Sequence, residues 1–74
     1  MEHLLIEDQF NVLKYDFENH IRPQLQGEMT LELSHPWLSV HLAHEEDLML
    51  AIRFLVVNGR SFSYKYITEP NHDA

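Results

Sequence analysis

The most regular alternation of apolar and polar side chains in this chain is Met29-Thr30-Leu31-Glu32-Leu33-Ser34-His35-Pro36-Trp37-Leu38-Ser39-Val40-His41-Leu42. A period of two is typical of strands with one buried face. His35-Pro36 interrupts the alternation, so we predict two strands joined there in an antiparallel hairpin. Its register makes three apolar cross-strand pairs on one face: Leu33–Leu38, Leu31–Val40 and Met29–Leu42.

Before this hairpin the apolar spacing changes to that of a helix. Apolar residues recur every three or four positions at Ile6, Phe10, Leu13, Phe17 and Ile21. This spacing forms one stripe on a 3.6-residue period. Pro23 disfavours helical geometry at Arg22. We therefore predict an N-terminal helix over about residues 3–22.

After the hairpin, the apolar segment 48–57 fits two interpretations. It ends at Asn58-Gly59, a pair that supplies the positive φ angles of a type I′ hairpin turn. On this basis residues 48–57 are predicted to be a strand that pairs with a strand over 60–68. A helix is the alternative, because acidic residues precede the segment, as suits a helix N-terminus. The residues of the segment that also fit a helical period are Leu48, Ala51, Ile52, Leu55 and Val56.

Together these elements predict one α+β domain over residues 1–74, with the N-terminal helix packed on a four-stranded antiparallel meander in two layers. The predicted strands are 28–34, 37–43, 48–57 and 60–68, and the tail 69–74 is expected to fray. A chain of 74 residues buries only about 60% of its unfolded surface. With no cysteine, it has no disulfide to compensate. A second subunit would supply the missing core, and we predict a homodimer.

A surplus of apolar residues on the third predicted strand indicates where a partner would bind. The side chains expected to point away from the core there are Leu50, Ile52, Phe54 and Val56, with Trp37 beside them. Exposed apolar patches are rare in monomers and typical of interfaces. Burial of the same residues under the helix is the alternative. A Phe54→Glu variant would separate the two, because it would unfold only if Phe54 belongs to the core.

Charge also favours a protein partner. Twelve acidic and five basic residues give a net charge of −7, which argues against direct binding of nucleic acid. Glu45, Glu46 and Asp47 form an acidic cluster that we expect to steer a basic protein partner. A solvated face without any partner is the alternative.

His41 and His44 are the candidate metal ligands, since they precede the carboxylates of residues 45–47 and zinc accepts both ligand types. The signal is weak because residues three apart on a strand point to opposite faces. Cysteine nucleophiles, Gly-rich phosphate loops and Gly-x-Ser-x-Gly motifs are absent from the sequence. We therefore expect no enzyme and no cofactor.

No export signal or membrane segment is predicted, because the apolar segment 48–57 is too short to span a bilayer and carries Arg53. We expect a cytoplasmic protein. Its predicted function is that of a small acidic protein–protein interaction module of accessory, inhibitory or adaptor type, homodimeric through the sheet. A metal- or small-ligand-binding dimer is the alternative, and an enzyme with a site at the dimer interface is the third.

Overall fold

The alternating residues form the predicted hairpin in a computed structural model that describes residues 1–67. Strands β2 (Met29–Ser34) and β3 (Trp37–Leu42) pair in antiparallel fashion. The register is the predicted one: Met29–Leu42, Leu31–Val40 and Leu33–Leu38. This part of the prediction is confirmed. The predicted fraying of residues 69–74 concerns residues outside the described part of the chain.

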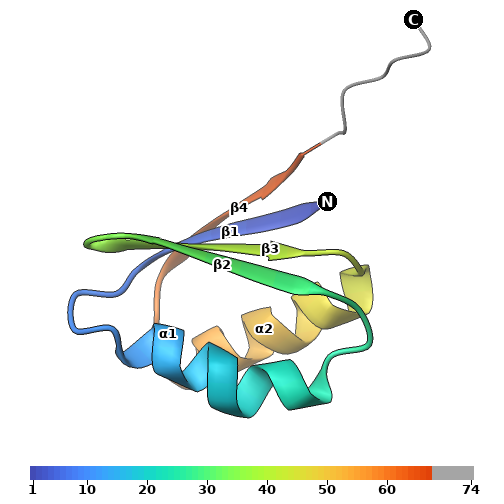
Figure 1. Cartoon of the computed structure of the whole chain (residues 1–74), viewed down its shortest axis with the longest axis horizontal. Coiled ribbons are helices and arrows are strands. Elements are labelled where there is room, and N and C mark those ends of the chain that lie inside the picture. Colours follow the sequence, from blue (N-terminus) through green and yellow to red (C-terminus); the bar gives the residue numbers. More distant parts are fainter. Residues whose placement is uncertain (68–74) are drawn as a thin grey trace, which may run out of the picture.

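The predicted N-terminal helix is wrong in its first half. Residues Glu2–Glu7 form strand β1, which lies between β3 and β4 (Phe62–Tyr66) in the sheet (Figure 1). Leu4 and Ile6 are fully buried there, so Ile6, the first residue of the predicted helical stripe, follows the period of a strand. Its later members Leu13, Phe17 and Ile21 are buried in the helix, as predicted. The helix begins only at Val12. It consists of α1 (Val12–Asp16), a π-helical turn (Phe17–Ile21) and a 3₁₀ turn (Arg22–Gln24).

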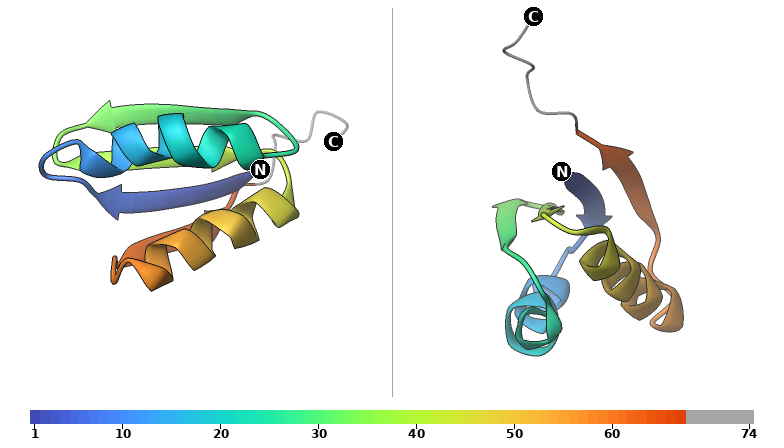
Figure 2. Two further views of the ribbon diagram at one scale, coloured as in Figure 1. Left: turned by 90° about the horizontal axis from the view of Figure 1, so that it is seen from below. Right: turned by 90° about the vertical axis from the view of Figure 1, so that its right-hand side faces the viewer.

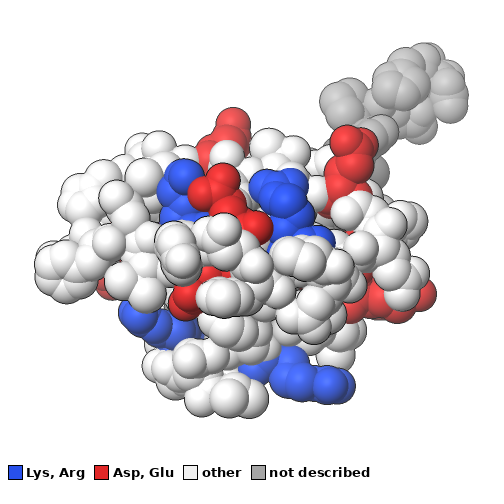
Figure 3. Space-filling view, turned by 60° about the horizontal axis from the view of Figure 1, so that its bottom comes forward, with Lys and Arg blue, Asp and Glu red and all other residues white. Residues whose placement is uncertain are grey.

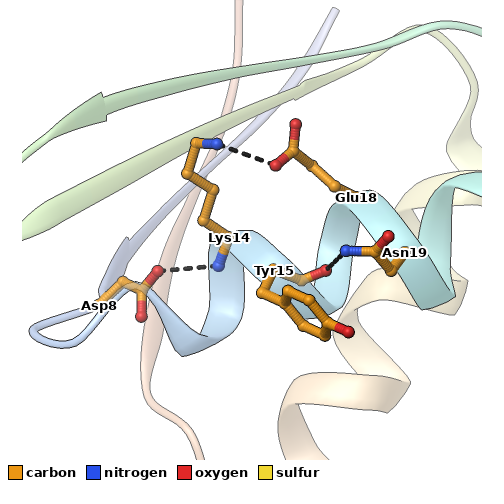
Figure 4. A network of polar contacts seen from close by, with 5 residues as sticks. All are labelled: Asp8, Lys14, Tyr15, Glu18 and Asn19. Atoms are coloured by element: carbon orange, nitrogen blue, oxygen red, sulfur yellow. Dashed lines mark hydrogen bonds and ion pairs between the residues drawn. The ribbon is translucent and has the colours of Figure 1, made fainter.

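A buried carboxylate starts this helix. Asp8 is 1% exposed, and its two oxygens accept the backbone N–H groups of Leu13 at 3.0 Å and Lys14 at 2.8 Å. Figure 4 shows the bond to Lys14. The backbone N–H of Asp8 donates to the Pro36 carbonyl at 2.7 Å. Asp8 therefore ends β1, caps α1 and ties both to the β2–β3 turn, because the first N–H groups of a helix lack partners within it.

The predicted strand 48–57 is also wrong, and its helical alternative is confirmed. Helix α2 spans Glu45–Val57. It ends in a Schellman motif, in which Gly59 N–H donates to Val56 at 3.0 Å and Arg60 N–H donates to Leu55 at 2.8 Å. Gly59 has a φ of 69°. The predicted type I′ turn, with positive φ angles at both residues, is therefore wrong: Asn58 has a φ of −92°, and the positive φ of Gly59 ends a helix.

Because α2 replaces a strand, the sheet is not a meander. Its order is β2-β3-β1-β4 with every neighbouring pair antiparallel. Both helices cover one face of the sheet and leave the other face open (Figure 2). This β-α-β-β-α-β arrangement is the split β-α-β, or ferredoxin-like, topology. An α+β fold with a four-stranded antiparallel sheet is confirmed, whereas the predicted single helix and element order are not.

The core lies between the sheet and the two helices. Twelve buried apolar residues form it: Leu4, Ile6, Leu13, Phe17, Ile21, Met29, Leu38, Val40, Leu42, Leu48, Ala51 and Leu55. Every other strand and both α-helices contribute at least one residue to this cluster. β4 is therefore the strand least anchored in the core.

Candidate functional site

The predicted apolar contact surface does not exist as one surface. Trp37 lies on the open face of the sheet and is 45% exposed. Leu50, Ile52 and Phe54 lie on α2, on the other side of the sheet, and are half-buried against the core. Among the predicted contact residues that lie on α2, only Val56 is largely exposed. The prediction failed because it placed these residues with the period of a strand.

Phe54 belongs to the contact between the two helices. Its ring meets that of Phe17 edge to face, with centroids 5.8 Å apart and planes at 85°. Phe17 is completely buried. Phe54 therefore packs between the helices at the border of the core, and its ring is used in this internal contact.

The acidic cluster also divides into surface and structural residues. Glu45 and Glu46 are exposed in the first turn of α2, but Asp47 is 2% exposed. The Asp47 carboxylate accepts the backbone N–H groups of Gln26 at 2.9 Å and Gly27 at 2.8 Å. Asp47 therefore anchors the loop before β2 and is not available to steer a partner. On the face that carries the helices, acidic and basic side chains are interspersed among uncharged ones (Figure 3).

His41 and His44 occupy different environments. His41 lies on β3, where its ring stacks on that of His3 with centroids 4.5 Å apart. His44 precedes α2, and its ring fills the space beside Gly27, where an added Cβ would lie 2.1 Å from His44 Cδ2. Within residues 1–67, no three His, Cys, Asp or Glu side chains converge into a group that could hold a metal ion. The structure therefore gives the proposed pair of metal ligands no common site.

The two stacked histidines belong to a row of titratable side chains that crosses the open face of the sheet from Glu32 to Lys65. The antiparallel pairings place His3 between His41 on β3 and Lys65 on β4. His41 Nε2 lies 3.3 Å from Glu32 Oε1 on β2. Partial burial lowers the pKa of His3, and the neighbouring His41 and Lys65 lower it further, whereas Glu32 opposes the shift. The row therefore disfavours a positive charge on His3.

This shift makes the stability of the protein depend on pH. Since the pKa of His3 is lower in the folded state than its ordinary value of 6.5, the unfolded chain binds the proton more readily. The free energy of unfolding should be highest above pH 6.5 and fall as the pH drops toward the lowered pKa. We expect urea denaturation at about pH 7.5 and pH 5.5 to show this loss. A His3→Gln variant should lose less over the same interval. An equal loss in the variant would contradict this assignment.

The surface that sequence analysis missed is the free edge of β4. Within residues 1–67, this strand pairs with β1 alone. The Met1 ammonium donates to the Ile67 carbonyl and Ile67 N–H donates to the Met1 carbonyl, both at 2.8 Å. Hydrogen-bonded pairs alternate along an antiparallel ladder, so Lys65 and Ser63 also face β1. The backbone N–H and C=O groups of Phe62, Tyr64 and Tyr66 therefore point to the free edge.

Exposed apolar side chains lie beside these free backbone groups. Tyr64 and Tyr66 are 47% and 58% exposed on the face of β4 that the helices cover only in part. We call the surface formed by the outward backbone groups of β4 and the side chains of Tyr64 and Tyr66 the β4 edge surface.

A buried carboxylate orients Tyr64, one of the two tyrosines of the β4 edge surface. The Tyr64 hydroxyl donates a hydrogen bond to Glu2, a buried residue of β1. This bond, with desolvation and the charges of Glu2 and Glu45, raises the pKa of Tyr64 to about 12. The bond fixes the ring of Tyr64 while leaving its outer side accessible.

The opposite edge of the sheet is less open. Ala43 N–H donates to the Glu28 carbonyl at 3.3 Å, so the outward backbone groups of β2 belong to Met29, Leu31 and Leu33. The Met29 carbonyl accepts a hydrogen bond from Arg22 Nη1 at 3.0 Å. A side chain of the protein thus occupies one end of this edge. Within residues 1–67, one outward group of β2 is thus occupied, whereas no backbone hydrogen bond reaches the outward groups of β4.

No protein-family model, curated protein or solved structure matches this chain. The split β-α-β topology occurs in proteins of many unrelated functions, so function has to be argued from the surfaces. None of the helices in residues 1–67 combines the length and apolar character needed to cross a membrane.

Two hollows of similar size lie away from the β4 edge surface. One, of about 330 Å³, is lined by residues 7–10 and 59–61, and its Asp8 carboxylate is already occupied by backbone N–H groups. The other, of about 320 Å³, lies between the helices and includes Ile21, Leu50 and Phe54, with Arg53 at its rim.

Proposed function

We propose that this protein is a small protein–protein interaction module that binds its partner through the β4 edge surface. The observation that carries the proposal is the row of outward backbone groups at Phe62, Tyr64 and Tyr66 beside exposed tyrosine rings. Addition of a strand to such an edge satisfies the backbone groups, and neighbouring side chains provide specificity. The recognition mode would therefore be strand addition.

The composition of the edge supports this function. Folded proteins commonly protect exposed edges with charges, proline or a covering element, because free edges invite association. Within β4 the only charged residue is Lys65, although the whole chain has a net charge of −7. Tyrosine is enriched at interfaces, because its ring buries a large area and its hydroxyl retains a polar contact. The edge thus has the composition of a contact surface.

The proposal is tested with a double variant, Tyr64→Lys with Tyr66→Lys. Leu33→Lys is the matched control, because Leu33 is 39% exposed at the opposite edge. Each tagged protein, checked for folding by circular dichroism, is used to capture partners from a lysate, with quantification by mass spectrometry. We expect the double variant to capture at least about tenfold less partner protein than the wild type and the control do. Equal recovery by all three proteins would overturn the proposal.

A further inference from the structure

We propose that the partner at the β4 edge is a second copy of this chain, paired strand to strand about a twofold axis at Tyr64. This inference rests on the proposed function and specifies its partner. The two four-stranded sheets would join into one continuous antiparallel sheet. Twofold dimers are the commonest oligomers, and both copies contribute the same surface patch to the interface.

The hydrogen-bonding pattern of the edge fits this axis, and charge favours it over an axis at Lys65. A twofold axis at Tyr64 places Tyr64 opposite its own copy and Phe62 opposite Tyr66 of the second copy. All three residues direct their N–H and C=O groups outward. Every outward group within β4 therefore gains a partner. An axis at Lys65 would also match outward groups, but it would place Lys65 directly opposite its own copy, which like charges disfavour.

The side chains fit the same register on both faces of the joined sheet. On the helix side, Phe62 would face Tyr66 and Tyr64 would face its copy, and aromatic cross-strand pairs stabilise antiparallel strands. On the open face, Lys65 would lie opposite Ser63, so no two like charges are directly paired. Neither strand brings a carboxylate to the junction. The Glu2 carboxylate, which accepts the Tyr64 hydroxyl, lies beside the junction in each copy, and each copy carries a net charge of −7, so added salt should strengthen the dimer.

The size of the chain gives a second reason for self-association. At 74 residues, the protein has a small core, to which β4 contributes only the partly buried Phe62. Pairing with a second β4 would cover Tyr64 and Tyr66 and extend the buried surface at the weakest side of the sheet. Small chains commonly gain stability from a second subunit in this way.

Single-cysteine variants test the register directly, because the chain contains no cysteine. Cα atoms in a hydrogen-bonded antiparallel pair lie about 5.5 Å apart, within the range that a disulfide spans. Tyr64→Cys should therefore form a covalent dimer on mild oxidation. Leu33→Cys, exposed at the other edge, is the matched control, and Ser63→Cys tests the neighbouring position on the opposite face. We expect Tyr64→Cys to link at least about fivefold faster than either control.

Sedimentation equilibrium of the unmodified chain completes the test. We expect a mass of twice 8.8 kDa that returns to 8.8 kDa in the Tyr64→Lys, Tyr66→Lys variant. Tyr64→Phe should remain a dimer, since it keeps the ring and loses only the bond to Glu2. A monomer at every concentration, equal cross-linking at Leu33→Cys, or a dimer that survives the double lysine variant would each overturn the second-copy inference. If the chain is a monomer but capture from lysate still depends on Tyr64 and Tyr66, the proposed function stands with a different partner.

Discussion

Replacing Phe54 by glutamate is expected to lower the free energy of unfolding by about 3–5 kcal/mol. The substitution removes the edge-to-face contact with Phe17 and introduces a carboxylate beside the apolar core. A domain of this length has a total stability of about 4–11 kcal/mol, at about 0.05–0.15 kcal/mol per residue. Most of the variant should therefore unfold on mild heating. Urea denaturation followed by circular dichroism measures the loss.

Val57→Glu provides the control for Phe54→Glu. Val57 lies on the same helix and is 77% exposed. Its replacement adds the same charge near the C-terminus of α2, where a negative charge costs about 0.3–1 kcal/mol. We expect a loss within that range. If Phe54→Glu were as stable as Val57→Glu, the ring would not close the core between the helices.

Removing the Asp47 carboxylate is expected to cost about 2–4 kcal/mol in the Asp47→Ala variant. The substitution leaves the backbone N–H groups of Gln26 and Gly27 without the acceptor that they have in the folded protein. It also removes a favourable negative charge from the first turn of α2. Amide hydrogen exchange at Gln26 and Gly27 should become faster, and urea denaturation gives the change in stability.

Glu46→Ala separates these two contributions. Glu46 occupies the same helical turn but is exposed, so its removal alters the charge at the helix N-terminus and breaks no buried hydrogen bond. We expect its loss to stay below about 1 kcal/mol. Asp47→Asn keeps one acceptor oxygen and should fall between the two variants. Equal stability of Asp47→Ala and Glu46→Ala would refute the anchoring role of Asp47.

These variants show why the candidate site was only partly predictable. Leu50, Ile52, Phe54 and Asp47 attract attention as apolar or acidic residues in a short stretch, and the same features serve a buried helix equally well. Composition does not distinguish a surface carboxylate from one that binds two backbone N–H groups of a loop twenty residues away in the sequence. The β4 edge was missed because edge position is a property of strand order, whereas Tyr64 and Tyr66 alone indicate only a strand.

The sequence by itself determined the β2–β3 hairpin, including its register, because a period of two on both sides of a turn permits only one set of apolar pairs on one face. It also determined the α+β class. Tertiary structure decided whether residues 2–7 and 45–57 became strand or helix, because short apolar segments satisfy both periods. Contacts between segments of the folded chain stabilise the observed secondary structure. Examples are the hydrogen bonds of Asp8 with α1 and of Asp47 with the loop before β2. Strand order likewise depends on pairing between β1 and β4, which lie at opposite ends of the described chain and share no local signal.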